Sequence, residues 1–249
     1  MPFPGPAAPR VLAVVPARYA STRFPGKPLV DLAGVPMIVR VLERAALASS
    51  ISEVVAATDD ERIAAVVKSV GRRVVMTSES CQSGTDRVAE AVATLGFDGD
   101  LVVNVQGDEP LLDPADLDAL VIRTLRLGTD LGTLARPLEP DAFLNPNVVK
   151  VVRALDGRAL YFSRAAIPHS GSSVALRHIG LYAYRPAALR RLAALEPTPL
   201  ERCERLEQLR ALENGLSIAV IDAPSTHPCV AVDTPADAAQ VIAILTENR

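Results

Sequence analysis

Short apolar runs alternate with amphipathic segments along the first half of the chain. The runs with the length and β-branched content of buried strands are Val11–Val15, Glu53–Ala57, Arg73–Met76 and Leu101–Val105. After each of them, apolar residues recur at helical spacing. The helices that this spacing predicts cover Pro36–Ala48, the segment from Asp60 to about Val70, Thr85–Leu95 and roughly Pro114–Arg126. The repeated alternation predicts an α/β fold with a doubly wound, mostly parallel, Rossmann-like sheet.

The alternation breaks between about residues 130 and 185. Strand-like runs follow one another there without long helices between them, at Leu131–Arg136, Val148–Val152, Leu160–Phe162 and His178–Tyr184. We therefore expect an antiparallel lobe inserted into the core sheet, where it would cover substrate or make a dimer contact. Beyond the lobe the α/β rhythm returns. The last predicted elements are a helix over Arg205–Glu213, a strand over Ser217–Ile221 and a helix from Pro235 to about Thr246.

Composition narrows the class of protein. Four prolines in the first nine residues predict a disordered tail over residues 1–9, followed by a single domain over residues 10–249. A net charge of −3, with no Trp and few aromatic residues, argues against a nucleic-acid binder. We find neither a signal peptide nor an apolar run near the ~20 residues of a membrane span, so we expect a cytoplasmic protein without membrane insertion. The three cysteines and three histidines are too scattered for a zinc site.

A basic loop follows the first predicted strand. The segment Arg18–Lys27 (RYASTRFPGK) holds three cations and two hydroxyls in ten residues. Ligands of open α/β sheets bind at the carboxyl ends of strands, and clustered cations, hydroxyls and backbone N–H groups suit a triphosphate. The segment matches neither the P-loop nor the dinucleotide-binding fingerprint. On this loop alone, two interpretations stay open: a triphosphate site, or a solvated basic loop that binds nothing.

Two carboxylates follow short apolar runs elsewhere in the chain. Asp108 lies in NVQGDEP, directly after a predicted strand, and Asp233 lies in VAVDTP. A carboxylate at each strand end suits Mg²⁺, which takes one or two carboxylates together with phosphate oxygens. The alternative for Asp233 is an ordinary helix start. For Asp108 the preceding Gly107 favours a site, because glycine permits a close approach of the backbone to a ligand.

A set of collinear motifs runs through nearly the whole chain after Arg10. They are VVPARYASTRFPGKPL (14–29), QSGTDR (82–87), NVQGDEP (104–110), NPNVVKVV (145–152), ALYFSRAAIP (159–168), RHIGLYAYR (177–185), LEQLRALENG (206–215) and VDTP (232–235). Together these motifs resemble the 3-deoxy-manno-octulosonate cytidylyltransferases. Two departures are the proline-rich tail and the short segment HSGSSVAL (169–176).

The resemblance implies an activity and its participants. Such enzymes activate 3-deoxy-manno-octulosonate (Kdo) with CTP for lipopolysaccharide assembly. The C2 hydroxyl of Kdo attacks the α-phosphate of CTP, and pyrophosphate leaves. The resemblance thus implies CTP and Kdo as small-molecule substrates, Mg²⁺ as the cofactor and a homodimer, with the lobe around Val148–Tyr184 as the contact surface. No residue of the chain is predicted as a general base.

The resemblance also implies a role for each matching residue. The implied nucleotide-binding residues are Ala17, Arg18, Ser21, Arg23, Lys27, Ser83, Gly84, Thr85 and Asp108. The implied catalytic residues are Lys27, Arg23, Asp108 and Asp233, and the two aspartates hold the metal. The implied sugar-binding residues are Arg87, Gln106, Arg164, His178, Tyr182, Glu207 and Gln208.

The chemistry of Kdo fits the residue types implied for its pocket. Its carboxylate suits a bidentate arginine such as Arg87 or Arg164, and its hydroxyls suit the remaining polar side chains. In a predicted strand, alternation places His178 and Tyr182 on one face. Without the resemblance, a buried structural histidine, a tyrosine at the core edge and a solvated helix face at Glu207 are the simpler interpretations.

Three hypotheses about function stay open. The first is a cytidylyltransferase for Kdo. The second is a nucleotidyltransferase for another acidic sugar, such as a sialic acid or an amino-Kdo, and the sugar-side residues decide between these two. The third is a non-catalytic nucleotide- or sugar-binding protein. Lys27, Asp108 and Asp233 argue against the third hypothesis, because a mere binder has little use for two metal carboxylates.

Overall fold

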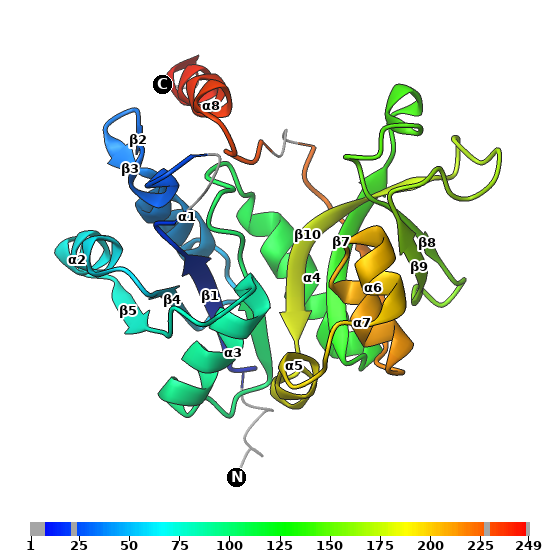
Figure 1. The fold of residues 1–249 in the computed structure, drawn as a ribbon, viewed down its shortest axis with the longest axis horizontal. Coiled ribbons are helices and arrows are strands. Elements are labelled where there is room, and N and C mark those ends of the chain that lie inside the picture. Colours follow the sequence, from blue (N-terminus) through cyan, green and yellow to red (C-terminus); the bar gives the residue numbers. More distant parts are fainter. Residues whose placement is uncertain (1–7, 21–23, 227–229, 248–249) are drawn as a thin grey trace, which may run out of the picture.

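The computed structural model describes residues 8–20, 24–226 and 230–247, and its core is a mixed sheet. The main path of the sheet runs β11–β7–β10–β6–β1–β4–β5 (Figure 1). In chain order its strands are β1 (Val11–Ala17), β4 (Glu53–Thr58), β5 (Arg73–Met76), β6 (Leu101–Asn104), β7 (Leu131–Pro137), β10 (Leu176–Tyr184) and β11 (Ile218–Asp222). Neighbouring strands are parallel except that β10 runs antiparallel to both β6 and β7. The predicted doubly wound, mostly parallel α/β fold is confirmed.

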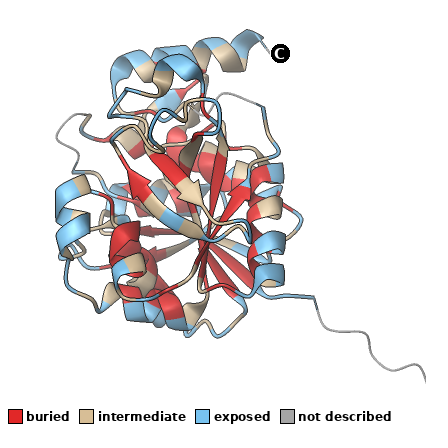
Figure 2. Cartoon of the chain, turned by 90° about the vertical axis from the view of Figure 1, so that its right-hand side faces the viewer, coloured by how far each residue is buried: buried red, intermediate tan, exposed pale blue. Residues whose placement is uncertain are grey.

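Helices cover both faces of this sheet. On one face lie α1 (Met37–Ala46), α2 (Glu61–Ser69) and α4 (Pro114–Leu127), and on the other lie α3 (Gly84–Leu95), α5 (Pro186–Ala193) and α7 (Gln208–Glu213). Strand alternation creates the two cores, because Ala13 faces the first layer and Leu12 the second. Buried residues accordingly concentrate in the strands and on the inward faces of the helices (Figure 2). No helix within the described ranges has the length and apolar character needed to cross a membrane.

A hairpin extends the sheet where the sequence predicts a lobe. Strands β8 (Lys150–Arg153) and β9 (Ala159–Ser163) pair with each other, and β8 also pairs with the first residues of β10. The hairpin lies to the right of the sheet in Figure 1, beside α6 (Pro199–Glu204) and α7. Strand β7 and the rest of β10 lie within the main sheet.

The predicted helix over Arg205–Glu213 is wrong in its first part. Pro199–Glu204 already forms a helix, α6, and Arg205 then takes a left-handed backbone conformation with a φ of 55°. The early start has a local cause, because Pro199 occupies the first helical position and the Thr198 N–H donates to the carboxylate of Glu201 at 3.1 Å. Helix α7 begins only at Gln208. The predicted helix is therefore shortened to α7, and α6 before it is an additional helix.

A separate small core holds the C-terminal helix α8 (Pro235–Glu247). The helix packs against the hairpin of β2 (Asp31–Leu32) and β3 (Val35–Pro36), and it stands apart from the main body in Figure 1. The segment before α8 is tied to the loop after β6, because the N–H of Val232 donates to the carbonyl oxygen of Asp108 at 2.8 Å. This backbone contact brings the residue after Val232, Asp233, to the end of β6.

Candidate active site

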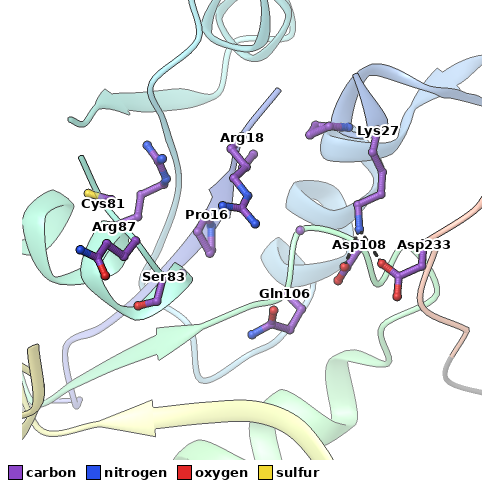
Figure 3. Close-up of a pocket in the computed structure, with 14 residues that line it drawn as sticks. Pro16, Arg18, Lys27, Cys81, Ser83, Arg87, Gln106, Asp108 and Asp233 are labelled. Carbon is purple, nitrogen blue, oxygen red and sulfur yellow. Dashed lines mark hydrogen bonds and ion pairs between the residues drawn. The ribbon is translucent and has the colours of Figure 1, made fainter. Parts of the chain in front are cut away.

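A cleft opens at the carboxyl ends of β1 and β6. Its cavity volume is about 270 Å³, and its walls come from four segments that are distant in the sequence (Figure 3). The predicted site residues that line it are Ala17, Arg18, Lys27, Ser83, Gly84, Arg87, Gln106, Asp108 and Asp233. Tertiary structure thus gathers most of the implied nucleotide and metal residues in one place, as expected for a ligand site at strand ends.

Lys27 joins the two aspartates at the mouth of the cleft. Its Nζ lies 2.8 Å from an oxygen of Asp108 and 3.1 Å from an oxygen of Asp233 (Figure 3). The lysine starts a short 3₁₀ turn after Gly26, whose φ of 73° is left-handed and favours glycine. The Gly26 N–H donates to the carbonyl oxygen of Tyr19 at 3.0 Å and so closes the basic loop.

The two carboxylates fit the Mg²⁺ that the sequence implies. They approach one cation closely enough to share it, and their oxygens are the hard donors that Mg²⁺ prefers. Their side chains are 28% and 37% exposed, so phosphate oxygens and water can complete the coordination. Among the described residues no group of three or more His, Cys, Asp or Glu side chains is arranged for a metal. Asp108 and Asp233 would therefore hold the ion together with the nucleotide.

The basic loop is anchored by an aromatic residue. Tyr19 packs on the first core, and the guanidinium carbon of Arg62 on α2 lies 3.3 Å from the centre of its ring. Arg62 is itself paired with Asp60, the N-cap of α2, at 2.6 Å. Arg18 is exposed and faces the cleft. The predicted phosphate ligands Ser21 and Arg23 lie outside the described residues.

The N-terminus of α3 forms the opposite wall of the cleft. The Ser83 side chain accepts from the N–H of Asp86, and the Asp86 side chain accepts from the N–H of Ser83, which makes a capping box. The helix therefore starts firmly at Gly84, with its positive end at the cleft. Thr85 points elsewhere, because it is buried and its hydroxyl donates to the carboxylate of Glu207.

Arg87 reaches the cleft as a side chain that is already paired. One guanidinium nitrogen lies 2.6 Å from the carboxylate of Asp59, and another lies 2.6 Å from the hydroxyl of Thr77. Only 4% of the side chain is exposed. Asp59 therefore fixes the orientation of Arg87, a role that sequence reasoning did not find because the contact joins residues 28 positions apart.

The loop after β6 lies very close to β1. A Cβ at Gly107 would lie 2.6 Å from the backbone oxygen of Pro16, so only glycine fits. The group that approaches Gly107 is the chain itself, so the expected close approach of a ligand stays a prediction. Gln106 donates to the backbone oxygen of Gly180 at 3.2 Å and thereby links this loop to β10.

His178 and Tyr182 lie side by side on β10, with ring centres 5.5 Å apart. A ring nitrogen of His178 is 2.9 Å from the hydroxyl of Thr133. Burial lowers the pKa of His178 to about 3 and raises the pKa of Tyr182 well above its usual value. Near neutral pH both side chains are therefore uncharged hydrogen-bonding groups.

Several buried polar atoms of residues that do not themselves line the cleft have no hydrogen-bond partner among the described residues. They are Asn104 Oδ1, Glu109 Oε2, Glu207 Oε1 and Gln208 Nε2. Such atoms are rare in folded proteins and mark places where a ligand or water completes the bonding. Burial, together with the charges of Asp108 and Asp116, raises the pKa of Glu109 to about 7. Glu109 and Asn104 lie in the motif NVQGDEP, but no local pattern distinguishes them from its other polar residues.

Glu207 faces a second, wider cavity of about 790 Å³. This cavity adjoins the first one at Cys81, Gln82 and Ser83, which line both. Arg164, by contrast, lines neither cavity. Its guanidinium donates to the backbone oxygens of Glu204 at 2.9 Å and Pro146 at 3.2 Å.

The fold and the cleft define a nucleotidyltransferase-like α/β enzyme, and comparison with known proteins makes this specific. A family model described as cytidylyltransferase matches residues 12–218. The 3-deoxy-manno-octulosonate cytidylyltransferase of Myxococcus xanthus is 53% identical over 240 residues, which covers 95% of this chain and 96% of the relative. That of Geobacter sulfurreducens is 47% identical, with 93% and 98% covered. The chain belongs to the cytidylyltransferase family.

A solved structure supports the same assignment. It is a CMP:2-keto-3-deoxy-manno-octonic acid synthetase complexed with CTP, which superimposes with a TM-score of 0.91 at 37% identity. The match covers 96% of this chain and all of that one. The resemblance drawn from the collinear motifs is confirmed, and the chain is a nucleotidyltransferase.

Proposed function

We propose that this protein transfers the CMP group of CTP to Kdo, with release of pyrophosphate. The observation that carries the proposal is the convergence of Lys27, Asp108 and Asp233 at the mouth of a cleft that a basic loop and a helix N-terminus enclose. This arrangement suits a polyphosphate and its metal. The high identity to 3-deoxy-manno-octulosonate cytidylyltransferases over nearly the whole chain supports the choice of nucleotide and sugar.

The triphosphate is expected to lie between the basic loop and the start of α3. Arg18 and Lys27 supply positive charge, and the first turn of α3 supplies the positive end of a helix. Charge gathers on the pyrophosphate as it departs, and Lys27 is placed to stabilise it. Most of the catalysis is then positioning and charge neutralisation, as is usual for transfer at phosphorus.

Asp108 and Asp233 would hold the Mg²⁺ in this reaction. When bound, the ion neutralises phosphate charge and lowers the pKa of the attacking hydroxyl. The residues of the chain orient the two substrates so that the hydroxyl oxygen forms a bond to the α-phosphorus while the bond to the pyrophosphate oxygen breaks. The hydroxyl proton passes to solvent. The Lys27 ammonium lies between the two carboxylates, so a metal ion held by both of them would displace it toward the phosphates.

The sugar is expected at the ends of β6 and β10, next to the nucleotide. Neutral His178 and Tyr182 offer hydrogen bonds to hydroxyls without the cost of a buried charge. Glu207 and Gln208 each have a buried polar atom that a hydroxyl would satisfy. Arg87, held by Asp59, is the arginine of the cleft best placed to meet the sugar carboxylate.

We further propose that the protein is a homodimer formed through the β8–β9 hairpin. Among the described strands β9 pairs with β8 alone, and one isolated bridge joins Arg158, the residue before β9, to Ala219 of β11, so most of the second edge of β9 is unpaired. The apolar side chains of Leu144, Leu155, Leu160 and Val174, all in or near this lobe, are largely exposed. Edge strands and exposed apolar side chains gathered in one region favour an interface. A cytoplasmic location and a role in lipopolysaccharide assembly follow from the proposed activity and stay predictions.

The decisive experiment is an incubation of the purified protein with CTP, Kdo and Mg²⁺, followed by measurement of pyrophosphate and CMP-Kdo. We expect release with Kdo, and little release with a sialic acid or with ATP in place of CTP. Release with another acidic sugar but not with Kdo would replace the proposed substrate. Tight binding of CTP with no release for any sugar acid would instead indicate a nucleotide-binding protein.

A further inference from the structure

Two residues outside the cleft hold the backbone of Arg164 from opposite sides. The Arg164 N–H donates to the carboxylate of Glu204 at 2.9 Å, and Lys150 donates to the Arg164 carbonyl oxygen at 2.6 Å. The side chain of Arg164 also contacts Glu204, because its Nε donates to the backbone oxygen of Glu204 at 2.9 Å. Arg164 directly follows β9, and Glu204 ends α6. The contacts therefore join the hairpin to the α6–α7 segment.

Lys150 is a fully buried cation at the base of this junction. Its ammonium also donates to the carbonyl oxygens of Val148 at 2.7 Å and Asn145 at 2.9 Å, so all three N–H groups are used. Burial of a charge is costly, and burial accordingly lowers the pKa of Lys150. The three bonds give the ammonium a fixed position, and through it the turn at Asn145 and the end of β9 keep a fixed separation.

Glu204 links the end of β9 to the turn that leads to Glu207. Besides the Arg164 N–H, its carboxylate accepts from the hydroxyl of Ser163 at 2.6 Å. Only Arg205, in its left-handed conformation, and the buried Leu206 separate it from Glu207. At the far end of the same turn the Glu207 carboxylate accepts from Thr85. The turn is thus held at both ends, by β9 and by α3.

We propose that Lys150 and Glu204 are positioning residues that set Glu207 and Gln208 for the acidic sugar. This inference rests on the proposed function, since Glu207 Oε1 and Gln208 Nε2 are buried and have no hydrogen-bond partner among the described residues, although Oε1 lies 3.8 Å from the guanidinium of Arg210. Neither Lys150 nor Glu204 lines either cavity. They act through the turn that carries Glu207 and Gln208, and the nucleotide side of the cleft does not depend on them.

The test compares Glu204→Ala and Glu204→Gln with the matched control Asp130→Ala. Asp130 accepts from the N–H and the hydroxyl of Ser217 at 2.8 and 2.7 Å, which are the same kinds of bonds as at Glu204. It directly precedes β7, at the end of the sheet opposite the carboxyl ends that form the cleft. Steady-state kinetics are measured for the sugar and for CTP. Hydrogen exchange of the backbone amides is followed at residues 205–208 and 82–87. Lys150→Met is carried as a second variant if it folds.

For Glu204→Ala we expect the KM for the sugar to rise about tenfold or more while the KM for CTP changes by less than about twofold. Amides 205–208 should exchange faster, and amides 82–87 should not. Glu204→Gln should recover most of the sugar KM, because its amide oxygen can accept from Arg164 and its NH₂ can donate to Ser163. Asp130→Ala should lose stability and keep both KM values.

Three results would overturn the assignment. Equal changes in both KM values, or the same changes in Asp130→Ala, would leave only a general role in stability. Unchanged exchange at residues 205–208 would show that Glu204 does not hold the turn. If the wild-type protein fails to use Kdo, the proposed function fails on its own, and the exchange data together with the KM for the accepted acidic sugar still decide this inference.

Discussion

The ammonium of Lys27 lies 2.8 Å from a carboxylate oxygen of Asp108, although 81 positions of the chain separate the two residues. The same ammonium bonds Asp233 at 3.1 Å, so one cation links the basic loop, the end of β6 and the segment before α8. The side chains of Lys27, Asp108 and Asp233 are partly exposed, so a nucleotide can reach the lysine and a metal can reach the aspartates. Several predictions about single residues depend on this arrangement.

Replacing Lys27 with Met should leave the fold intact and lower kcat with CTP and Kdo by at least about 100-fold. The reason is the loss of a positive charge that stabilises the departing pyrophosphate, which is worth this order in related cases. Pyrophosphate release measures it. Lys68→Met, an exposed change on α2, is the control and should keep the wild-type rate. An unchanged rate in Lys27→Met would mean that the loop does not touch the phosphates.

Asp233→Asn should fold normally and lose turnover. An amide supplies no negative charge to a metal, so binding of Mn²⁺ in the presence of CTP, followed by electron paramagnetic resonance, should weaken by about tenfold or more. Asp222→Asn, an exposed change at the end of β11, serves as the control. Wild-type Mn²⁺ affinity and full activity in Asp233→Asn would remove Asp233 from the metal site.

Two glycine substitutions should separate the nucleotide side from the sugar side. Gly107→Ala places a Cβ 2.6 Å from the Pro16 oxygen, so we expect a stability loss of about 1–3 kcal/mol and a higher KM for CTP. A Cβ at Gly180 meets no atom within 4 Å, so Gly180→Ala should keep stability and the KM for CTP. If the sugar lies beside His178 and Tyr182, its KM alone should rise in Gly180→Ala. Equal behaviour of the two variants would contradict this division.

His178 should make the folded protein less stable as the pH falls. Its pKa is about 3 when folded and near 6.5 when unfolded, so the unfolded chain binds more protons between these values. The contribution of His178 is complete above pH 6.5 and declines by at most about 1.4 kcal/mol per pH unit as the pH falls. Glu109, with its raised pKa of about 7, acts in the opposite direction between about pH 4.5 and 7.

Urea unfolding at several pH values between 7.5 and 5 measures this effect by difference. Wild type and His178→Gln share Glu109, so their difference in unfolding free energy isolates the histidine. We expect wild type to lose stability relative to His178→Gln as the pH falls below 6.5. Parallel curves for the two proteins would show that His178 is protonated equally in both states.

The double substitution Leu155→Asp and Leu160→Asp should convert a dimer into a monomer. Each aspartate places a charge on the exposed apolar region of the β8–β9 hairpin, and an interface there would have to bury it unpaired. Sedimentation of the wild type and the variant gives the oligomeric state. The control is Leu47→Asp. Leu47 is 66% exposed at the C-terminal end of α1, which lies on the other side of the molecule from the hairpin in Figure 1. A dimer that survives the double change must use another surface.

The sequence predicted the α/β order well, because strand and helix periodicity are local properties. The buried runs of β1, β4, β5 and β6 and the amphipathic helices between them are where the pattern placed them. The pattern erred at the start of the predicted helix Arg205–Glu213, because Arg205 is left-handed and α7 begins only at Gln208. It also missed α5, α6 and the β2–β3 hairpin, whose short lengths leave few positions in which a period can be recognised.

The collinear motifs predicted most of the residues around the cleft, but only the tertiary structure decided which groups each of these residues contacts. Lys27 and Asp108 meet because the parallel strands β1 and β6 bring their carboxyl ends together, a contact that no local pattern encodes. Asp233 follows no strand of the described ranges, contrary to the prediction, and joins them because the Val232 N–H bonds the carbonyl oxygen of Asp108. The pairing of Arg87 with Asp59 and the hold of Lys150 and Glu204 on Arg164 likewise join distant segments. Sequence alone fixed which chemistry was available, and packing fixed which groups are paired, neutral or left open for a ligand.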